Sequence, residues 1–191
     1  MSKKLGVEMA SVIVGNKKEF DRALANAVEQ EYESIVISSV DNDYWEINYI
    51  QDDFDAKLII KSGKIILGGK TKAEAREDSR IIALDKIELS AYGNSRVMAI
   101  NNSRIDAFGA STVIAYGSSC VRAACNSRVI AHEQSTVNAH NSSKIIARGY
   151  SKVYAHDYCH VTAFDVALIG RMSENAKIEI NDFSYETEDD I

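Results

Sequence analysis

Four histidines and three cysteines are the side chains of this sequence best suited to metal binding or nucleophilic catalysis. The histidines lie late in the chain, at positions 132, 140, 156 and 160. The cysteines, at positions 120, 125 and 159, match no zinc-binding pattern. An odd and sparse set of cysteines favours reduced thiols in a cytoplasmic protein over a disulfide framework. We therefore expect no metal ion and no other cofactor.

Carboxylates that could serve as a general acid and base, or bind a cation, gather near the N-terminus. They lack the spacing of a calcium-binding loop, so we expect a solvated loop. No nucleophile stands in a recognisable pattern with a base, and we expect the protein not to be an enzyme. The carboxylates in question are Asp41, Asp43, Glu46, Asp52, Asp53 and Asp55.

The middle of the chain consists of an eight-residue repeat, and this repeat must position any functional side chains that lie there. Alanine recurs at every eighth position from Ala75 to Ala163. Two residues before nearly every alanine stands Val, Ile or Leu, and two before that usually Ser. A period of two within each unit indicates a short strand, and Gly, Asn or Ser at each junction indicates a tight turn. The sequence therefore predicts a parallel β-solenoid, a mainly β fold.

The outward residues indicate how many strands form one coil. Between Val and Ala, alternate units carry an apolar residue, whereas the intervening units carry Glu74, Ser90, Asp106, Arg122, Asn138 and Tyr154. This separation predicts a two-sided coil of about 16 residues and a solenoid of about seven coils. A three-sided coil stays open, because four basic residues recur at intervals of 24: Arg80, Arg104, Arg128 and Lys152.

The chain divides into three parts by composition. Residues 1–62 predict an N-terminal α/β cap: a strand at 10–14, a helix from about residue 17 with Asn16 as its N-cap and Glu19 three residues on, and a strand at 34–39. Residues 63–170 are the octapeptide-repeat solenoid. Residues 171–191 predict a closing strand, shifted by one inserted residue, and an acidic tail.

The octapeptide units, such as "AYGNSRVM" and "AYGSSCVR", resemble the 16-residue coils of bacterial ice-nucleation proteins and other short-repeat β-solenoids. The opening "SVIVGNKKEFDRALANAVEQEYESIVI" is similar to the strand–helix–strand that caps many right-handed parallel β-helices. The resemblance covers about half of the chain and implies the fold alone, since solenoids host many functions. Ice binding is not expected, because outward threonines are scattered.

The uniformly apolar outward set is the strongest candidate interface. A contiguous apolar ridge on a protein surface marks a binding site for another chain or a covering segment of the same chain. We expect a homodimer packed face to face, with another protein partner or intrachain cover by residues 1–60 or by the tail as alternatives. The set comprises Ile66, Ile82, Met98, Ile114, Ile130 and Ile146, widened by Leu84, Ile100 and Tyr116.

Charged residues offer further contacts. The net charge of −6 divides into −5, +4 and −5 over the three parts of the chain. Few aromatic residues stand between the bases, so we expect direct nucleic-acid binding to be absent. His140 and His156 occupy equivalent positions of successive coils with no carboxylate in step, which predicts surface histidines. The candidate polar contacts are Arg80, Arg96, Arg128, Lys144, Glu186, Glu188, Asp189 and Asp190.

These features predict a cytoplasmic, non-enzymatic interaction module. No apolar run reaches the ~18 residues of a membrane span, and no signal peptide is evident. Short chains of this kind resemble accessory proteins of phages, and a concrete function is an anti-CRISPR-like inhibitor docking on a host nucleic-acid-processing or defence complex. A structural solenoid of a cytoskeleton or virion is the alternative, and a carbohydrate-active β-helix is a third class.

Overall fold

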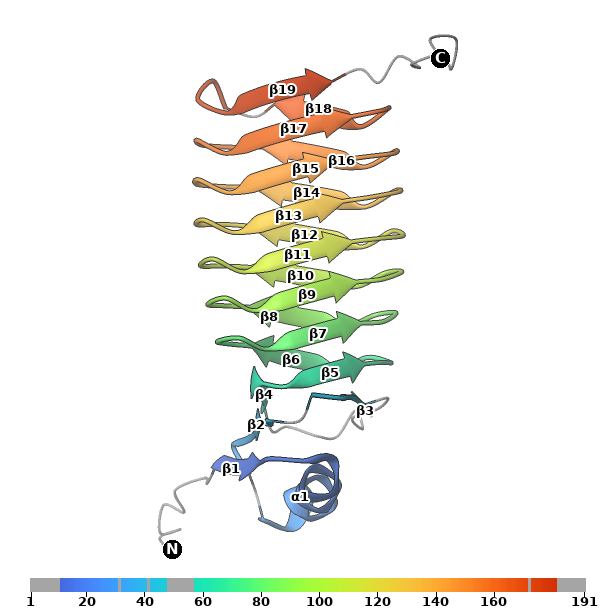
Figure 1. Ribbon diagram of the computed structural model, residues 1–191, viewed down its shortest axis with the longest axis vertical. Coiled ribbons are helices and arrows are strands. Elements are labelled where there is room, and N and C mark those ends of the chain that lie inside the picture. The colour runs from blue at the N-terminus through green and yellow to red at the C-terminus, as the bar shows by residue number, and fades with distance from the viewer. Residues whose placement is uncertain (1–10, 31, 41, 48–56, 172, 182–191) are drawn as a thin grey trace, which may run out of the picture.

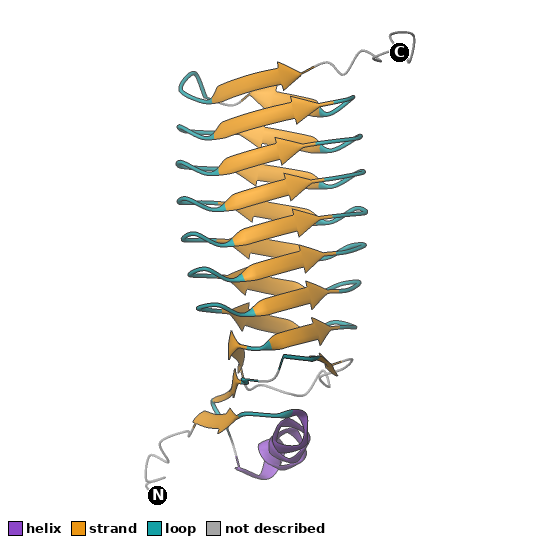
Figure 2. Cartoon of the chain, in the orientation of Figure 1, coloured by secondary structure: helices purple, strands orange, loops and turns teal. Residues whose placement is uncertain are grey.

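The computed structural model of the chain describes residues 11–30, 32–40, 42–47, 57–171 and 173–181. These residues form a parallel β-solenoid with one strand and one helix at its N-terminal end (Figures 1 and 2). Each coil contributes one strand to each of two facing sheets. The predicted two-sided coil is therefore confirmed, and Arg80 and Arg104, which suggested three sides, lie in opposite sheets.

We name the two sheets A and B, and their outer surfaces face A and face B. Sheet A holds, in spatial order, β1 (Ser11–Val14), β2 (Ser34–Ser38), β4 (Lys57–Ser62), β6 (Lys72–Ala75), β8 (Glu88–Ala91), β10 (Arg104–Ala107), β12 (Cys120–Ala123), β14 (Thr136–Ala139), β16 (Lys152–Ala155) and β18 (Leu168–Arg171). Sheet B holds β3 (Tyr44–Ile47), β5 (Lys64–Leu67), β7 (Arg80–Ala83), β9 (Arg96–Ala99), β11 (Thr112–Ala115), β13 (Arg128–Ala131), β15 (Lys144–Ala147), β17 (His160–Phe164) and β19 (Lys177–Asn181).

Strands of successive coils pair in parallel and in strict register. Val113 of β11 lies between Val97 of β9 and Val129 of β13, one coil of 16 residues away on either side. The last pair of sheet B sets His160 beside Lys177, which confirms the single inserted residue in the third part of the chain. Eight coils, from β4 to β19, follow one another at about 4.8 Å, one more than the sequence predicted.

The register turns the repeat into columns of identical side chains. Along most strands the second and fourth residues point inward and are buried, so the core is built of Val, Ile and Ala columns. The first and third residues point outward. A serine before most strands from β7 to β16 adds a third buried position, and its small side chain fits where the chain turns into the strand. Ile87 takes this position before β8. Because inward positions recur every second residue, the sequence pattern and the core coincide.

The corners between strands repeat one backbone conformation. Thirteen corner residues, one at every eighth position, have a positive φ, and most of the acids and amides among them also form hydrogen bonds with the neighbouring coil. Asp157 Oδ2 accepts a hydrogen bond of 2.9 Å from the backbone N of Asn141, whose own Oδ1 accepts one from Cys125 N. Asp, Asn and Gly tolerate the left-handed region, which explains their recurrence at the junctions. The thirteen residues are Gly69, Glu77, Asp85, Gly93, Asn101, Gly109, Gly117, Cys125, Glu133, Asn141, Gly149, Asp157 and Asp165.

The buried serines differ in their hydrogen bonding, and this difference gives a testable prediction. The Ser119 hydroxyl donates to the carbonyl of Tyr116 at 2.8 Å, whereas the Ser127 hydroxyl has no partner, although both residues are fully buried. Removing a satisfied hydrogen bond costs about 0.5–1.5 kcal/mol, whereas removing an unsatisfied buried hydroxyl costs nothing and can stabilise. In urea unfolding we expect Ser119→Ala to lower the free energy of unfolding and Ser127→Ala to leave it unchanged or raise it. Equal losses in both variants would contradict this.

Helix α1 (Lys17–Gln30) closes the N-terminal end of the solenoid. Its predicted cap is confirmed, because Glu19 N donates to Asn16 Oδ1 at 3.0 Å. Phe20 is buried and meets Trp45 edge to face, with ring centroids 6.2 Å apart. Among the described residues, no helix is long and apolar enough to cross a membrane.

The C-terminal end lacks such a cover within the described residues. Ile178 and Ile180 of β19 stack on the inward residues Val161 and Ala163 of β17. Ile180 is nevertheless 70% exposed, and Leu168 of β18 is 59% exposed. The last coil therefore presents apolar residues and two edge strands at its end.

Candidate interaction surface

The predicted apolar set forms one column on face B. The register places Ile82 directly between Ile66 and Met98, and the stacking continues through Ile114 and Ile130 to Ile146. All six side chains are half-buried rather than fully exposed. The reason is the short spacing between coils, because each side chain is partly covered by its neighbours in the column. We call these six residues the apolar column.

A basic column runs beside the apolar column, one outward position away along each strand. It holds Lys64, Arg80, Arg96, Arg128 and Lys144, and Thr112 interrupts it at β11. Within the described part of the chain, no ion pair joins any of these five cations to an acid. The Lys64 ammonium instead donates a hydrogen bond to the carbonyl of Asn42. The outward positions of sheet B from β5 to β15 include no acid at all.

A third column borders the apolar column on its other side, and it contains the predicted Ile100 and Tyr116. The backbone at these positions continues the hydrogen bonds between successive coils, since Tyr116 N donates to the carbonyl of Ala99 at 2.8 Å. Tyr116 stacks on His132, with ring centroids 4.7 Å apart. Burial, together with the charge of Arg148, lowers the pKa of His132 and so favours its neutral form. The column widens the apolar region at the N-terminal half of face B.

A shallow groove of about 200 Å³ lies between the basic and apolar columns. The side chains of Arg80 and Arg96 line one wall, and those of Ile82, Met98 and Ile114 line the other. Tyr44 of β3 and the small Thr112 also line it. One wall can therefore contact an anion while the other contacts an apolar side chain. The sequence alone did not predict a groove, because its shape depends on the distance between the columns.

Face A differs, because most of its outward charges pair with each other between coils. Arg122 of β12 lies 3.1 Å from Asp106 of β10, and Lys72 lies 3.1 Å from Glu88. Burial raises the pKa of Glu74, but hydrogen bonds and charges from Lys57 and Arg76 outweigh it and hold the pKa below its usual value. Asp106 therefore takes part in an ion pair. Among the described residues, face A pairs most of its outward charges, with Arg104 and Lys152 as exceptions, whereas face B pairs none of its five cations.

The histidines do not form one site. His140 and His156 stack on face A with ring centroids 4.4 Å apart, whereas His132 and His160 lie on face B. The Asp157 carboxylate lies 3.8 Å from His140 Nδ1, which corrects the expectation that no carboxylate accompanies this pair. Burial and His156 lower the pKa of His140. Among the residues that the structure describes, no three His, Cys, Asp or Glu side chains gather as a metal-binding group.

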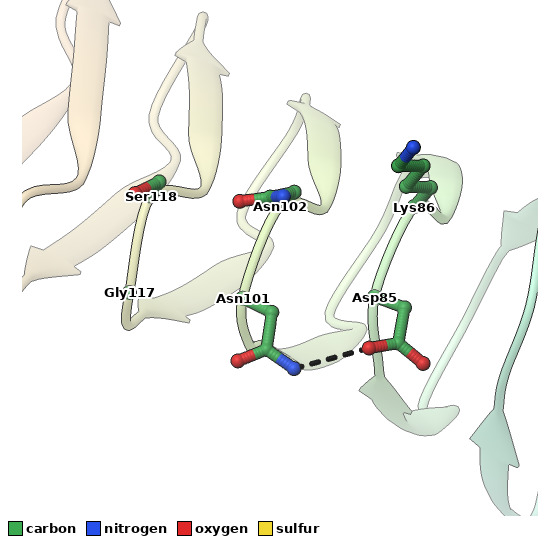
Figure 3. A pocket seen from close by; sticks show the side chains of 6 residues that line it. All are labelled: Asp85, Lys86, Asn101, Asn102, Gly117 and Ser118. Atoms are coloured by element: carbon green, nitrogen blue, oxygen red, sulfur yellow. Dashed lines mark hydrogen bonds between the residues drawn. The ribbon is translucent and has the colours of Figure 1, made fainter.

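A second hollow, of about 400 Å³, lies on the corner that follows the strands of sheet B (Figure 3). Its lining comes from three successive turns, and Asn101 Nδ2 donates to Asp85 Oδ1 at 3.1 Å. Lys86, Asn102 and Ser118 project along the same edge (Figure 3). The hollow brings together turn residues without a base beside a nucleophile, so it is a surface feature of the stacked corners.

Several predicted residues lie outside the described residues. These are the tail residues Glu186, Glu188, Asp189 and Asp190, together with Asp41, Asp52, Asp53 and Asp55 of the acidic segment. Of that segment, Asp43 and Glu46 are described. Asp43 is exposed just before β3, and Glu46 lies in β3, where it continues the line of the apolar column beside Ile66. Cys120 and Cys125 are exposed thiols, whereas Cys159 is buried, which raises the pKa of its thiol.

Comparisons of the chain with known protein families, curated proteins and solved structures find no match. The fold and the arrangement of faces A and B therefore carry the functional argument.

Proposed function

We propose that the protein is a non-enzymatic interaction module that binds another protein through face B. The contrast between the two faces carries this proposal. Face A pairs most of its outward charges between coils, with Arg104 and Lys152 as exceptions. Face B combines a continuous apolar column with five cations, none of which has an ion-pair partner in the described structure. Apolar surface rimmed by unpaired charge is typical of a protein-binding site.

The test compares two double variants of equal charge. Ile114→Glu with Ile130→Glu places two carboxylates in the apolar column, whereas Ser90→Glu with Asn138→Glu places two at the equivalent outward positions of face A. None of these four side chains points into the core, so both variants should fold. Light scattering gives the solution mass of each variant, and affinity capture followed by mass spectrometry identifies any bound protein.

We expect the wild type and the face A variant to share a binding event that the face B variant loses. The protein bound in that event is either a second copy of this chain or one identified partner. A wild-type monomer at every concentration, with the same captured proteins for all three forms, would overturn the proposal. The narrower prediction of a phage-encoded inhibitor stays a prediction, because neither face carries a residue specific to such a partner.

End-to-end association is a second candidate, favoured by the exposure of Ile180 and Leu168 at the C-terminal end. Helix α1 covers the opposite end, so this contact would join two C-terminal ends rather than build an open polymer. A dimer that persists in the face B variant and dissociates in Leu168→Asp with Ile180→Asp would establish it. Loss of the dimer in the face B variant alone would exclude it.

A further inference from the structure

We propose that the occupant of face B is an acidic amphipathic helix of another protein. The helix lies in the groove along the solenoid axis, with its acidic stripe on the basic column and its apolar stripe on the apolar column. This inference rests on the proposed function and specifies its partner. The arguments come from the charge of face B, from its repeat distance and from its width.

Charge argues for an acidic partner. A face-to-face homodimer, which the sequence predicts, brings together two surfaces whose outward strand positions from β5 to β15 hold cations and no acid. In an antiparallel pair the two basic columns oppose each other directly. In a parallel pair each basic column opposes the third column, where Lys144 meets Arg148. Neither arrangement neutralises Arg80, Arg96 or Arg128, whereas an acidic stripe pairs with each of them.

The repeat distance argues for a helix. Cations and apolar residues on face B recur about every 4.8 Å, the spacing of hydrogen-bonded strands. A helix presents one residue of each stripe per turn of about 5.4 Å, whereas an extended peptide presents alternate side chains about 6.6–6.8 Å apart. Over five turns the helix drifts by only ~3 Å from the columns, which the long Arg and Lys side chains can absorb. A helix of about 18 residues spans the groove and the columns beyond it.

The width of face B fits the same partner. The basic and apolar columns are two residues apart along each strand, or about 6.6 Å. A helix with its side chains is about 10–12 Å across, so one helix covers both columns. The gap at Thr112 and the hollow beside Met98 and Ile114 leave room for a larger apolar side chain. Recognition of an amphipathic helix in an apolar groove is an established binding mode.

The apolar column distinguishes this partner from a nucleic acid. A strand of phosphates would meet the basic column, but its bases would need stacking platforms beside it. The residues beside the basic column are aliphatic or thioether side chains, from Ile66 to Ile146. Apolar side chains at one position in every coil suit a protein partner.

The experiment measures fluorescence anisotropy with a labelled synthetic helix of about 18 residues, whose leucine stripe lies next to a glutamate stripe. A control peptide has the same composition, but its glutamates lie on the side opposite the leucines. We expect the first peptide to bind the full chain with a micromolar Kd and the control at least about tenfold more weakly. Raising the salt concentration should weaken binding, because the ion pairs are exposed.

Variants locate the peptide. Arg96→Glu with Arg128→Glu should weaken binding at least about tenfold, and Ile114→Glu with Ile130→Glu should abolish it. Ser90→Glu with Asn138→Glu should leave it unchanged. Equal affinity for the two peptides, or tighter binding of a single-stranded oligonucleotide, would overturn the inference. If the wild type forms a face B-dependent dimer that the peptide does not displace, the occupant is a second copy, and the proposed function survives without the helix.

Discussion

Truncation of Ile105 to alanine is expected to cause a large loss of stability. Ile105 of β10 is fully buried and stacks between Leu89 and Val121 in the inward column of sheet A. The Ile105→Ala variant removes three carbon atoms from a core that cannot collapse, because hydrogen-bonded neighbours fix the coil on both sides. Such truncations cost about 2–5 kcal/mol. In urea unfolding we expect the free energy of unfolding to fall by that amount, with a lower midpoint and an unchanged m-value if the solenoid unfolds as one unit.

Two further variants identify the cause. Ile105→Val should cost only about 0.5–1.5 kcal/mol, because valine is the usual residue of this column and loses one methyl group. Ile114→Ala on the half-buried outer surface of β11 should also cost less than Ile105→Ala. If Ile114→Ala proves the more destabilising, the core does not lie where the inward columns place it. If the m-value of Ile105→Ala falls sharply, the central coil has uncoupled the two ends of the solenoid.

The second large effect concerns a corner. Gly117 has a φ of +65°, and a Cβ there would meet backbone atoms of Asn101 at 3.0–3.1 Å. A β-branched residue adds strain, because the left-handed region costs an ordinary residue about 1–2 kcal/mol and valine more. We expect Gly117→Val to lower the free energy of unfolding by about 2 kcal/mol or more, measured by urea unfolding.

Neighbouring corners supply the controls for that variant. Asn101 and Asp85 have the same φ of 64° at the equivalent position of the two preceding coils, so a Cβ is tolerated there. Gly117→Asn should therefore cost less than about 1 kcal/mol, because asparagine adopts this conformation readily. Asn101→Gly should be nearly neutral, apart from its hydrogen bond to Asp85. A loss for Gly117→Asn as large as that for Gly117→Val would assign the cost to crowding against Asn101 rather than to the backbone conformation.

The sequence determined the fold of this protein to an unusual degree, and the reason is physical. A strand has a period of two, so the Val and Ala of each eight-residue unit point to the same side of their strand, and every unit repeats this inward pair. The difference between Ile114 and Arg122 at equivalent positions of successive units then revealed the two faces. The capping of α1 by Asn16 is a local hydrogen bond, and it too follows from neighbouring residues.

Tertiary structure decided the features that depend on distances between coils. The half-burial of the apolar column follows from the spacing of the coils, and the groove beside it follows from the interruption at Thr112. The approach of Asp157 to His140 depends on how a corner turns its side chain, which a repeat pattern does not encode. The register of the strands likewise decided which charges are paired. It sets Asp106 beside Arg122, so these two form an ion pair, whereas it sets Arg96 between Arg80 and Thr112, where no acid is adjacent in the column. The sequence determined which residues share a face, and the stacking of the coils decided which of them satisfy each other and which remain for a partner.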